Sequence, residues 1–301
     1  MIMKLATTTG DFSKFKIGDF KAIEELHNAG FKYIDLSIES ASLLRDDNWK
    51  ENALKLKEYA DSLGMKFVQS HAPGGNPLDE VKYPNLIPDT IRSIEVCGVM
   101  GIPNTVVHAG FTVGMNKEEF FEKNREFYRK LFPYMEEYGV EVLNENSCKV
   151  NQANWYWTNT GADIREFTKF VDHPLFHVCW DTGHANCEGS QYDEILAIGD
   201  ELYAVHINDN RGKQDEHILP FMGTLNMDEV VTALIDVNFK GYFTMECCSA
   251  LRPKKYWLGN RRDFEKNVRL AEPQLFMQRH LEKLLYDTGR YILESYDIFE
   301  E

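Results

Sequence analysis

The sequence predicts a single-domain α/β protein, a (β/α)8 TIM barrel in which parallel strands alternate with helices. Its length of 301 residues suits one such barrel, which typically takes ~250 residues plus loop insertions. Short β-branched or aromatic runs alternate with amphipathic stretches along the chain, a pattern typical of parallel strand pairing. No Gly-x-Gly-x-x-Gly follows the first run, at residues 8–12, so a closed barrel is favoured over an open dinucleotide-binding sheet.

The expected strands are short apolar runs that end in polar residues. Several of them follow a glycine placed where a left-handed residue would end the preceding helix, as at Gly30, Gly64 and Gly139. The strands, in chain order, are residues 4–8, 31–36, 65–69, 105–107, 140–143, 176–180, 203–205 and 242–245.

The expected helices have apolar faces at helical spacing, such as Phe20, Ile23 and Leu26 before Gly30. Pro133 falls inside the helical pattern of residues 117–138 and must kink or divide that helix. We expect the barrel to occupy residues 1–285 and a C-terminal tail to occupy residues 286–301. Long loops are predicted at residues 72–90, 147–160 and 249–263, all on the catalytic face of a barrel.

The composition limits the partners and the compartment. Lys and Arg total 33 against 48 Asp and Glu, giving a formal charge of −15 with no basic run, so we expect no nucleic-acid partner. No stretch approaches the roughly 18 apolar residues of a membrane helix, and the N-terminus lacks a signal-like apolar region. The six cysteines form no Cys-x-x-Cys pair and are expected to be reduced. These features predict a cytoplasmic protein without a membrane partner.

Ionisable side chains repeatedly occupy the ends of the predicted strands, where the strands of a barrel converge on one mouth. Such groups repel one another and lose solvation unless a cation joins them. Four of them come from successive strands and provide three carboxylates and one imidazole, which favours Mn²⁺ or Mg²⁺ over structural zinc. We expect one divalent ion, with manganese first and Mg, Co or Zn as alternatives. The strand-end residues are His71, His108, Glu145, Asp181, His184, His206 and Glu246, and the expected metal ligands are Glu145, Asp181, His206 and Glu246.

Three segments carry a resemblance to a known family: Val-Leu-Asn-Glu-Asn at 142–146, Cys-Trp-Asp-Thr-Gly-His-Ala-Asn at 179–186, and His-Ile-Asn-Asp-Asn-Arg-Gly at 206–212. The sequence resembles the sugar phosphate isomerase/epimerase family of xylose-isomerase-like barrels over nearly the whole chain. The resemblance implies that the four expected ligands hold the metal and that Glu145 and Glu246 flank the substrate as an acid/base pair. We assign His184 the positioning of a substrate hydroxyl.

A second resemblance is to endonuclease IV, a relative with a three-metal site. Its ligand types are matched by His71, His108, His184, Asp215 and His217. Because the chain is acidic and lacks a basic groove, we interpret these residues as substrate-binding, with extra metal ions as the alternative.

Other candidate substrate contacts come from the loops. Trp155 and Trp257 lie in aromatic clusters suited to the apolar face of a sugar, with loop packing or a subunit contact as the alternative. Arg211 and Arg252 are the nearest candidates for binding a substrate anion.

The predicted function is a metal-dependent isomerase or epimerase of a sugar or sugar phosphate. A carboxylate removes a proton next to a carbonyl, and the cation stabilises the enediolate. Alternatives on the same scaffold are a lyase or dehydratase, a C-glycoside-cleaving subunit, an apurinic endonuclease-like phosphodiesterase, and a non-catalytic sugar-binding subunit. The expected partner is a small sugar, and assembly as a homodimer or homotetramer stays open.

Overall fold

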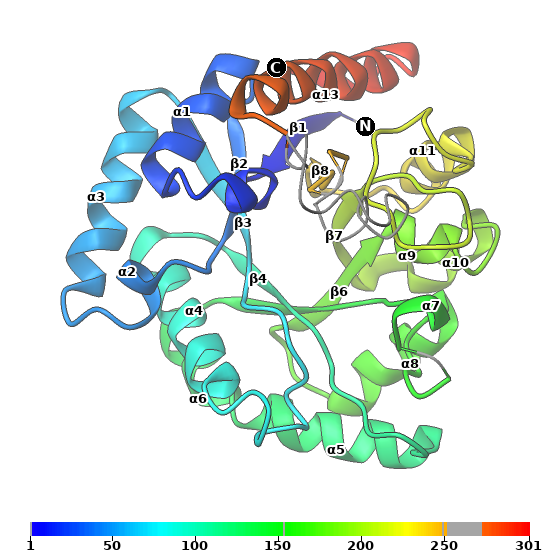
Figure 1. The fold of residues 1–301 in the computed structure, drawn as a ribbon. Helices are drawn as coiled ribbons and strands as arrows, with labels where there is room; N and C mark the ends of the chain where they lie inside the picture. Colours follow the sequence, from blue (N-terminus) through cyan, green and yellow to red (C-terminus); the bar gives the residue numbers. More distant parts are fainter. Residues whose placement is uncertain (1, 153, 249, 252–272) are drawn as a thin grey trace, which may run out of the picture.

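A computed structural model describes residues 2–152, 154–248, 250–251 and 273–301. Eight parallel strands form a closed barrel in which each strand pairs with the next along the chain and β1 pairs with both β2 and β8 (Figure 1). The predicted barrel is confirmed, and the expected strands differ from the observed ones only at their ends. The strands are β1 (Met3–Thr8), β2 (Tyr33–Ser37), β3 (Lys66–His71), β4 (Asn104–Val107), β5 (Glu141–Glu145), β6 (Phe176–Asp181), β7 (Leu202–Ile207) and β8 (Phe243–Met245).

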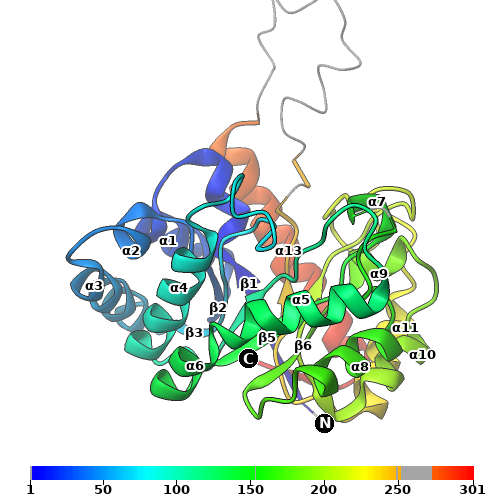
Figure 2. The same cartoon turned by 90° about the horizontal axis from the view of Figure 1, so that it is seen from below.

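Helices surround the barrel, and short helical turns follow several strands on the face that carries their carboxyl ends (Figure 1). Figure 2 shows α7 on the side of the barrel opposite the N-terminus. The helices are η1 (Thr9–Phe15), α1 (Asp19–Ala29), α2 (Ala41–Leu44), α3 (Trp49–Ser62), α4 (Leu86–Met100), α5 (Lys117–Arg129), α6 (Phe132–Tyr138), α7 (Lys149–Gln152), α8 (Gly161–Val171), α9 (Thr182–Asn186), α10 (Tyr192–Ile198), η2 (Gly199–Glu201), α11 (Met227–Asp236) and α13 (Leu275–Ser295).

The predicted division of the helical pattern at Pro133 is confirmed. Pro133 lies in the first turn of α6, where its missing N–H removes no internal hydrogen bond, and α5 ends just before it at Arg129. Gly139 then ends α6 in the left-handed conformation, with φ of 64°.

The C-terminal segment belongs to the barrel wall. The expected boundary between barrel and tail, at residues 285 and 286, falls inside α13, whose 21 residues run from Leu275 to Ser295. This helix packs on α1 and β1, and a Cβ at Gly289 would lie 2.5 Å from Leu5, so the glycine permits the close approach. Beyond α13, the short strand β9 (Phe299–Glu300) pairs with the start of β1. A two-residue strand has no periodicity, which explains why the sequence pattern did not predict it.

Two apolar layers hold the barrel together. The large layer lies between the strands and the helices, and a small interior layer consists of Val106, Leu143, Cys179 and Ala204. These four interior residues come from successive strands, β4 to β7. Because side chains alternate between the faces of a strand, the next interior position on each strand is two residues further on.

No helix in the described part of the chain is long and apolar enough to cross a membrane.

Candidate metal centre

Strand alternation places the predicted ligands at the mouth of the barrel. Two residues beyond each interior apolar side chain stand His108, Glu145, Asp181 and His206, in the same order of strands. Glu246 is likewise two residues beyond the buried Thr244 of β8. The alternation of side chains along each strand therefore places ionisable groups from neighbouring strands in a single layer.

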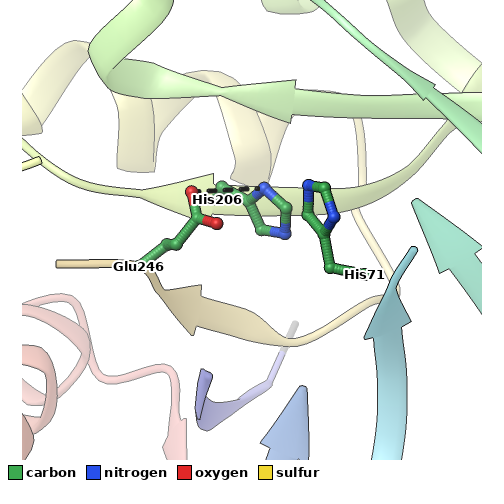
Figure 3. A group of neighbouring side chains, drawn as sticks. All are labelled: His71, His206 and Glu246. Carbon is green, nitrogen blue, oxygen red and sulfur yellow. Dashed lines mark ion pairs between the residues drawn. The ribbon is translucent and has the colours of Figure 1, made fainter. Parts of the chain in front are cut away.

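The four expected metal ligands form one cluster. Each of Glu145, Asp181, His206 and Glu246 offers a ligand atom, and these atoms lie within 4.8 Å of one another. The Nδ1 atom of His206 is 2.8 Å from Glu145 Oε1 and 3.6 Å from Glu246 Oε2. Figure 3 shows His206 between Glu246 and His71, with a dashed line marking the ion pair between His206 and Glu246. The four residues that the sequence predicts as ligands of one ion therefore lie close together in the folded protein.

Asp181 is held in place by the His184 backbone and by Asn208, a residue that received no role in the sequence prediction. Its carboxylate accepts hydrogen bonds from the His184 backbone N–H at 2.6 Å and from Asn208 Nδ2 at 2.7 Å. The Asn208 side chain passes so close to Gly183 that a Cβ there would lie 1.8 Å from Asn208 Oδ1. Glycine at 183 is thus required for the bond that orients Asp181.

His206 is oriented from behind by β2 and β3. Its Nε2 lies 3.3 Å from Asp35 Oδ2, and the Gln69 amide contacts both groups. A carboxylate on the second imidazole nitrogen fixes the tautomer and raises the basicity of a ligating histidine. The sequence prediction missed Asp35, although one signal was present: a lone acid within the apolar run of residues 31–36.

Two further groups of potential ligands adjoin the four-residue cluster. His71 Nε2 and His108 Nε2 lie 3.4 and 3.2 Å from Glu145 Oε2. On the other side, Asp215 lies 3.2 Å from His184 Nε2 and 3.0 Å from His217 Nε2. The residues predicted as a second set therefore do converge on the same site.

The carboxylates of this site are strongly perturbed by their surroundings. Burial alone would raise the pKa of Glu145, but the positive charge of His206 and its hydrogen bond to this carboxylate hold that pKa well below its usual range. The same balance of burial against His206 and His217 lowers the pKa of Glu246 to about 2. Asp181 differs, because burial dominates and raises its pKa to about 6.

Four of the five histidines at the site have raised pKa values, and His108 is the exception. Burial lowers the pKa of His108 to about 4, whereas at His71 the Glu145 carboxylate outweighs burial and raises the pKa to about 9. The pKa values of His184 and His217 are also raised, against burial, chiefly by nearby carboxylates, and that of His206 is raised by Cys179 together with Glu246 and Glu145. Raised imidazole pKa values mark an excess of negative charge that a bound cation would also satisfy.

The residues present fit a divalent cation. The buried side-chain atoms of the described residues that form no hydrogen bond include Glu145 Oε2, which has only the ion-pair contacts with His71 and His108, and His184 Nδ1. Both atoms are metal-ligand types, and a buried polar atom without a partner is unfavourable unless something else binds it. The donor set of three carboxylates and one imidazole suits an ion that accepts oxygen ligands.

The ligand cluster opens into a cavity of about 830 Å³. Its inner end is lined by most of the predicted substrate and acid/base residues: His71, His108, Glu145, His184, Asp215, His217 and Glu246. Asp181 and His206 lie beneath them, fully buried.

Two predicted substrate contacts are not brought to this cavity. The guanidinium of Arg211 turns away and donates to Glu216 Oε1 at 2.7 Å, leaving its side chain 62% exposed. Trp155, half-buried after α7, does not line the cavity either. Trp257 and Arg252 lie outside the described residues.

The chain belongs to the xylose isomerase-like TIM barrel family, whose model matches residues 23–269. It is similar to a D-psicose 3-epimerase of Enterocloster bolteae, with 23% identity over 261 residues that cover 81% of this chain and 82% of that protein.

Solved structures support the same fold. The structure of D-psicose 3-epimerase with D-tagatose from Clostridium cellulolyticum H10 aligns with a TM-score of 0.74 and 19% identity, covering 97% of this chain and 99% of that one. The IOLI protein, whose structure has a binding zinc atom, aligns with a TM-score of 0.72 and 19% identity, covering 98% and 99%. At these identities the structural likeness establishes the fold, and the chemistry has to be argued from the site.

Proposed function

We propose that the protein is a divalent-metal-dependent sugar epimerase or isomerase that moves a proton at a carbon next to a carbonyl. The observation that carries the proposal is the position of Glu145 and Glu246. Both carboxylates line the inner end of the cavity, both belong to the candidate metal cluster, and both have pKa values lowered by histidines. The family relationship to sugar 3-epimerases supports the same reaction class.

The two glutamates supply the proton transfers. In the proposed reaction, one glutamate acts as a carboxylate and removes the proton, and the other acts as a carboxylic acid, on the same or the opposite side, and returns a proton to the same carbon or its neighbour. A divalent ion held by Glu145, Asp181, His206 and Glu246 would supply positive charge for the oxygens of the substrate. His184 orients a substrate hydroxyl, because its side chain lines the cavity and its Nδ1 has no protein hydrogen-bond partner.

Deuterium exchange tests this proposal directly. The metal-loaded protein is incubated with a panel of ketoses in D₂O, and NMR follows loss of the proton signal next to the carbonyl together with the identity of the product. Glu246→Gln and Glu145→Gln are expected to slow exchange by roughly 100-fold or more. Glu141→Gln is the matched control, since Glu141 lies on β5 with Glu145 but four residues earlier, at the opposite end of the strand. Normal exchange by Glu246→Gln with normal metal content would show that the assignment is wrong.

A second candidate function, phosphodiester hydrolysis, is favoured by one observation. Several groups of ligand-type residues lie at or beneath the inner end of the cavity in the described part of the chain, among them His71, His108 and Glu145; Glu145, Asp181, His206 and Glu246; and His184, Asp215 and His217. Multi-metal sites of this kind can clamp the attacking and leaving oxygens of a phosphodiester. Metal analysis and nicking of abasic duplex DNA discriminate the two functions: three ions with nicking support the second, and one ion with sugar exchange supports the first.

A further inference from the structure

The cavity continues well beyond the ligand cluster. Its outer half is formed by the loop between β3 and α4 and by the loop between β4 and α5. None of the outer residues is a candidate metal ligand within the cluster. The outer wall includes Leu78, Asp79, Lys82, Tyr83, Phe111 and Val113.

Hydrogen bonds build this outer wall into one piece. Asn76 Nδ2 donates to the Phe111 carbonyl at 2.7 Å, and Asn76 Oδ1 accepts from the backbone N–H groups of Phe111 and Leu78 at 3.1 Å each. The buried Asn124 of α5 bonds both backbone groups of Gly110, at 2.7 and 2.9 Å. Both loops are therefore fixed before any ligand arrives, which lowers the entropy lost on binding.

The chemistry of the outer wall suits a ring rather than a phosphate. Tyr83 and Phe111 offer aromatic surface, and the Val113 side chain is left 82% exposed. Among the described residues, Lys82 is the single Lys or Arg that lines the cavity, and Asp79 lines it too. The Lys82 ammonium already sits 5.0 Å from the centre of the Tyr83 ring. One cation beside a carboxylate is a poor phosphate site, whereas aromatic and aliphatic surface binds the apolar face of a ring.

The cavity is also larger than a single sugar requires. Its volume of about 830 Å³ lies toward the upper end of the ~300–1,000 Å³ that is typical of pockets for drug-sized ligands. We propose that the outer half of the cavity binds a second ring joined to the reacting sugar, so that the substrate is a glycoside of a keto sugar. The second ring is either an aromatic group or another sugar, since both present an apolar face. This inference rests on the proposed epimerase or isomerase function.

Binding without turnover provides the first test. Calorimetry measures the affinities of phenyl glucoside, cellobiose, methyl glucoside and glucose 6-phosphate for the metal-loaded protein. At least one of the two-ring ligands is expected to bind about tenfold more tightly than methyl glucoside. A stronger phenyl glucoside identifies an aromatic group, and a stronger cellobiose identifies a second sugar. Equal binding of all three glucosides, or tightest binding of glucose 6-phosphate, would overturn the proposal.

Variants locate the effect on the outer wall. Tyr83→Ser and Val113→Ser are expected to abolish the advantage of the two-ring ligand while leaving the affinity for methyl glucoside unchanged. Val81→Ser is the matched control, because Val81 is 96% exposed on the same loop as Tyr83 and does not line the cavity. An advantage that survives both outer-wall variants would contradict the assignment.

Deuterium exchange separates this inference from the proposed function. Exchange is compared between a 3-keto glucoside carrying a phenyl group and one carrying a methyl group, as a ratio of kcat/KM. A phenyl preference of about tenfold that Tyr83→Ser removes supports the subsite. If both glucosides exchange with the same kcat/KM, the outer subsite is wrong but the proposed reaction stands. Absence of exchange from every keto sugar, together with preferential binding of a two-ring ligand, overturns the reaction and leaves the subsite standing.

Discussion

Two sets of buried carboxyl groups in this protein behave in opposite ways. At the mouth of the barrel, Glu145 and Glu246 have pKa values far below the usual range because histidines surround them. Between η1 and α13, Asp11 and Glu282 are fully buried, more deeply than Glu246, and lie against each other. Burial and the neighbouring acid raise the pKa of Asp11 well above its usual value, and burial raises that of Glu282 to about 7.

Hydrogen bonding accounts for the difference. Both oxygens of Asp11 and Glu282 Oε2 are buried without a donor, among the described residues. Two carboxylates can only accept, so contact between Asp11 and Glu282 is stable when one of them carries a proton. The comparison teaches that burial alone leaves a carboxyl group protonated, and that only positive charge at the mouth creates carboxylates able to bind a cation or accept a proton.

The largest effect is expected from Gly183→Ala. A Cβ at this position would lie 1.8 Å from Asn208 Oδ1, so the Asn208 side chain must move and release Asp181. Overpacking of this kind typically costs ~1–3 kcal/mol, and we expect about 3 kcal/mol here, with at least a tenfold loss of metal affinity. Urea unfolding and metal competition measure the two effects. Gly74→Ala, where a Cβ meets nothing within 4 Å, is the control for stability. If the metal affinity of Gly183→Ala is unchanged, the hydrogen bond from Asn208 to Asp181 is not needed for metal binding.

The Asp11 and Glu282 pair predicts a pH dependence of stability. The pKa of Glu282 is raised from 4.5 to about 7 in the folded state, so the folded state holds its proton more tightly than the unfolded state. The stabilisation from this proton is complete below pH 4.5 and is lost as the pH rises through 7. The loss amounts to roughly 3 kcal/mol at high pH.

Glu282→Gln should remove this component of the pH dependence, because the amide needs no proton. Urea unfolding of both proteins between pH 5 and pH 9, without added metal, gives the comparison. If the difference in stability between the wild-type protein and Glu282→Gln stays constant across this pH range, the folded protein does not hold a proton between Asp11 and Glu282.

The smallest of these effects is expected from Asp35→Asn. The amide keeps the size of the side chain but removes the charge behind His206, so metal affinity should fall by roughly 10- to 100-fold. Competition with a chelator measures that affinity. Asp11→Asn is the matched control, a buried acid beyond the ligand cluster, and it should change stability while leaving metal affinity nearly as it was. Equal losses in both variants would mean that overall charge, and not orientation of His206, controls the ion.

The sequence determined the strands and the ligands that strand alternation delivers. Each expected strand is a local pattern of apolar residues, and the alternation of side chains needs no information from elsewhere in the chain. For that reason Glu145, Asp181, His206 and Glu246 could be chosen from their positions, and the division at Pro133 follows from the chemistry of one residue.

Only the tertiary structure decided the contacts between residues distant in the chain. Asp35 reaches His206 across the barrel, Asn76 joins two loops, and residues 11 and 282 meet because α13 returns to the first strand. Arg211 shows the converse, since it lies next to a metal-ligand segment in sequence but folds back onto Glu216. Secondary structure arises from local spacing, whereas the partner of a side chain depends on how the whole barrel closes. That closure is the physical reason why the sequence predicted the ligands and left their supporting groups and the outer cavity to the structure.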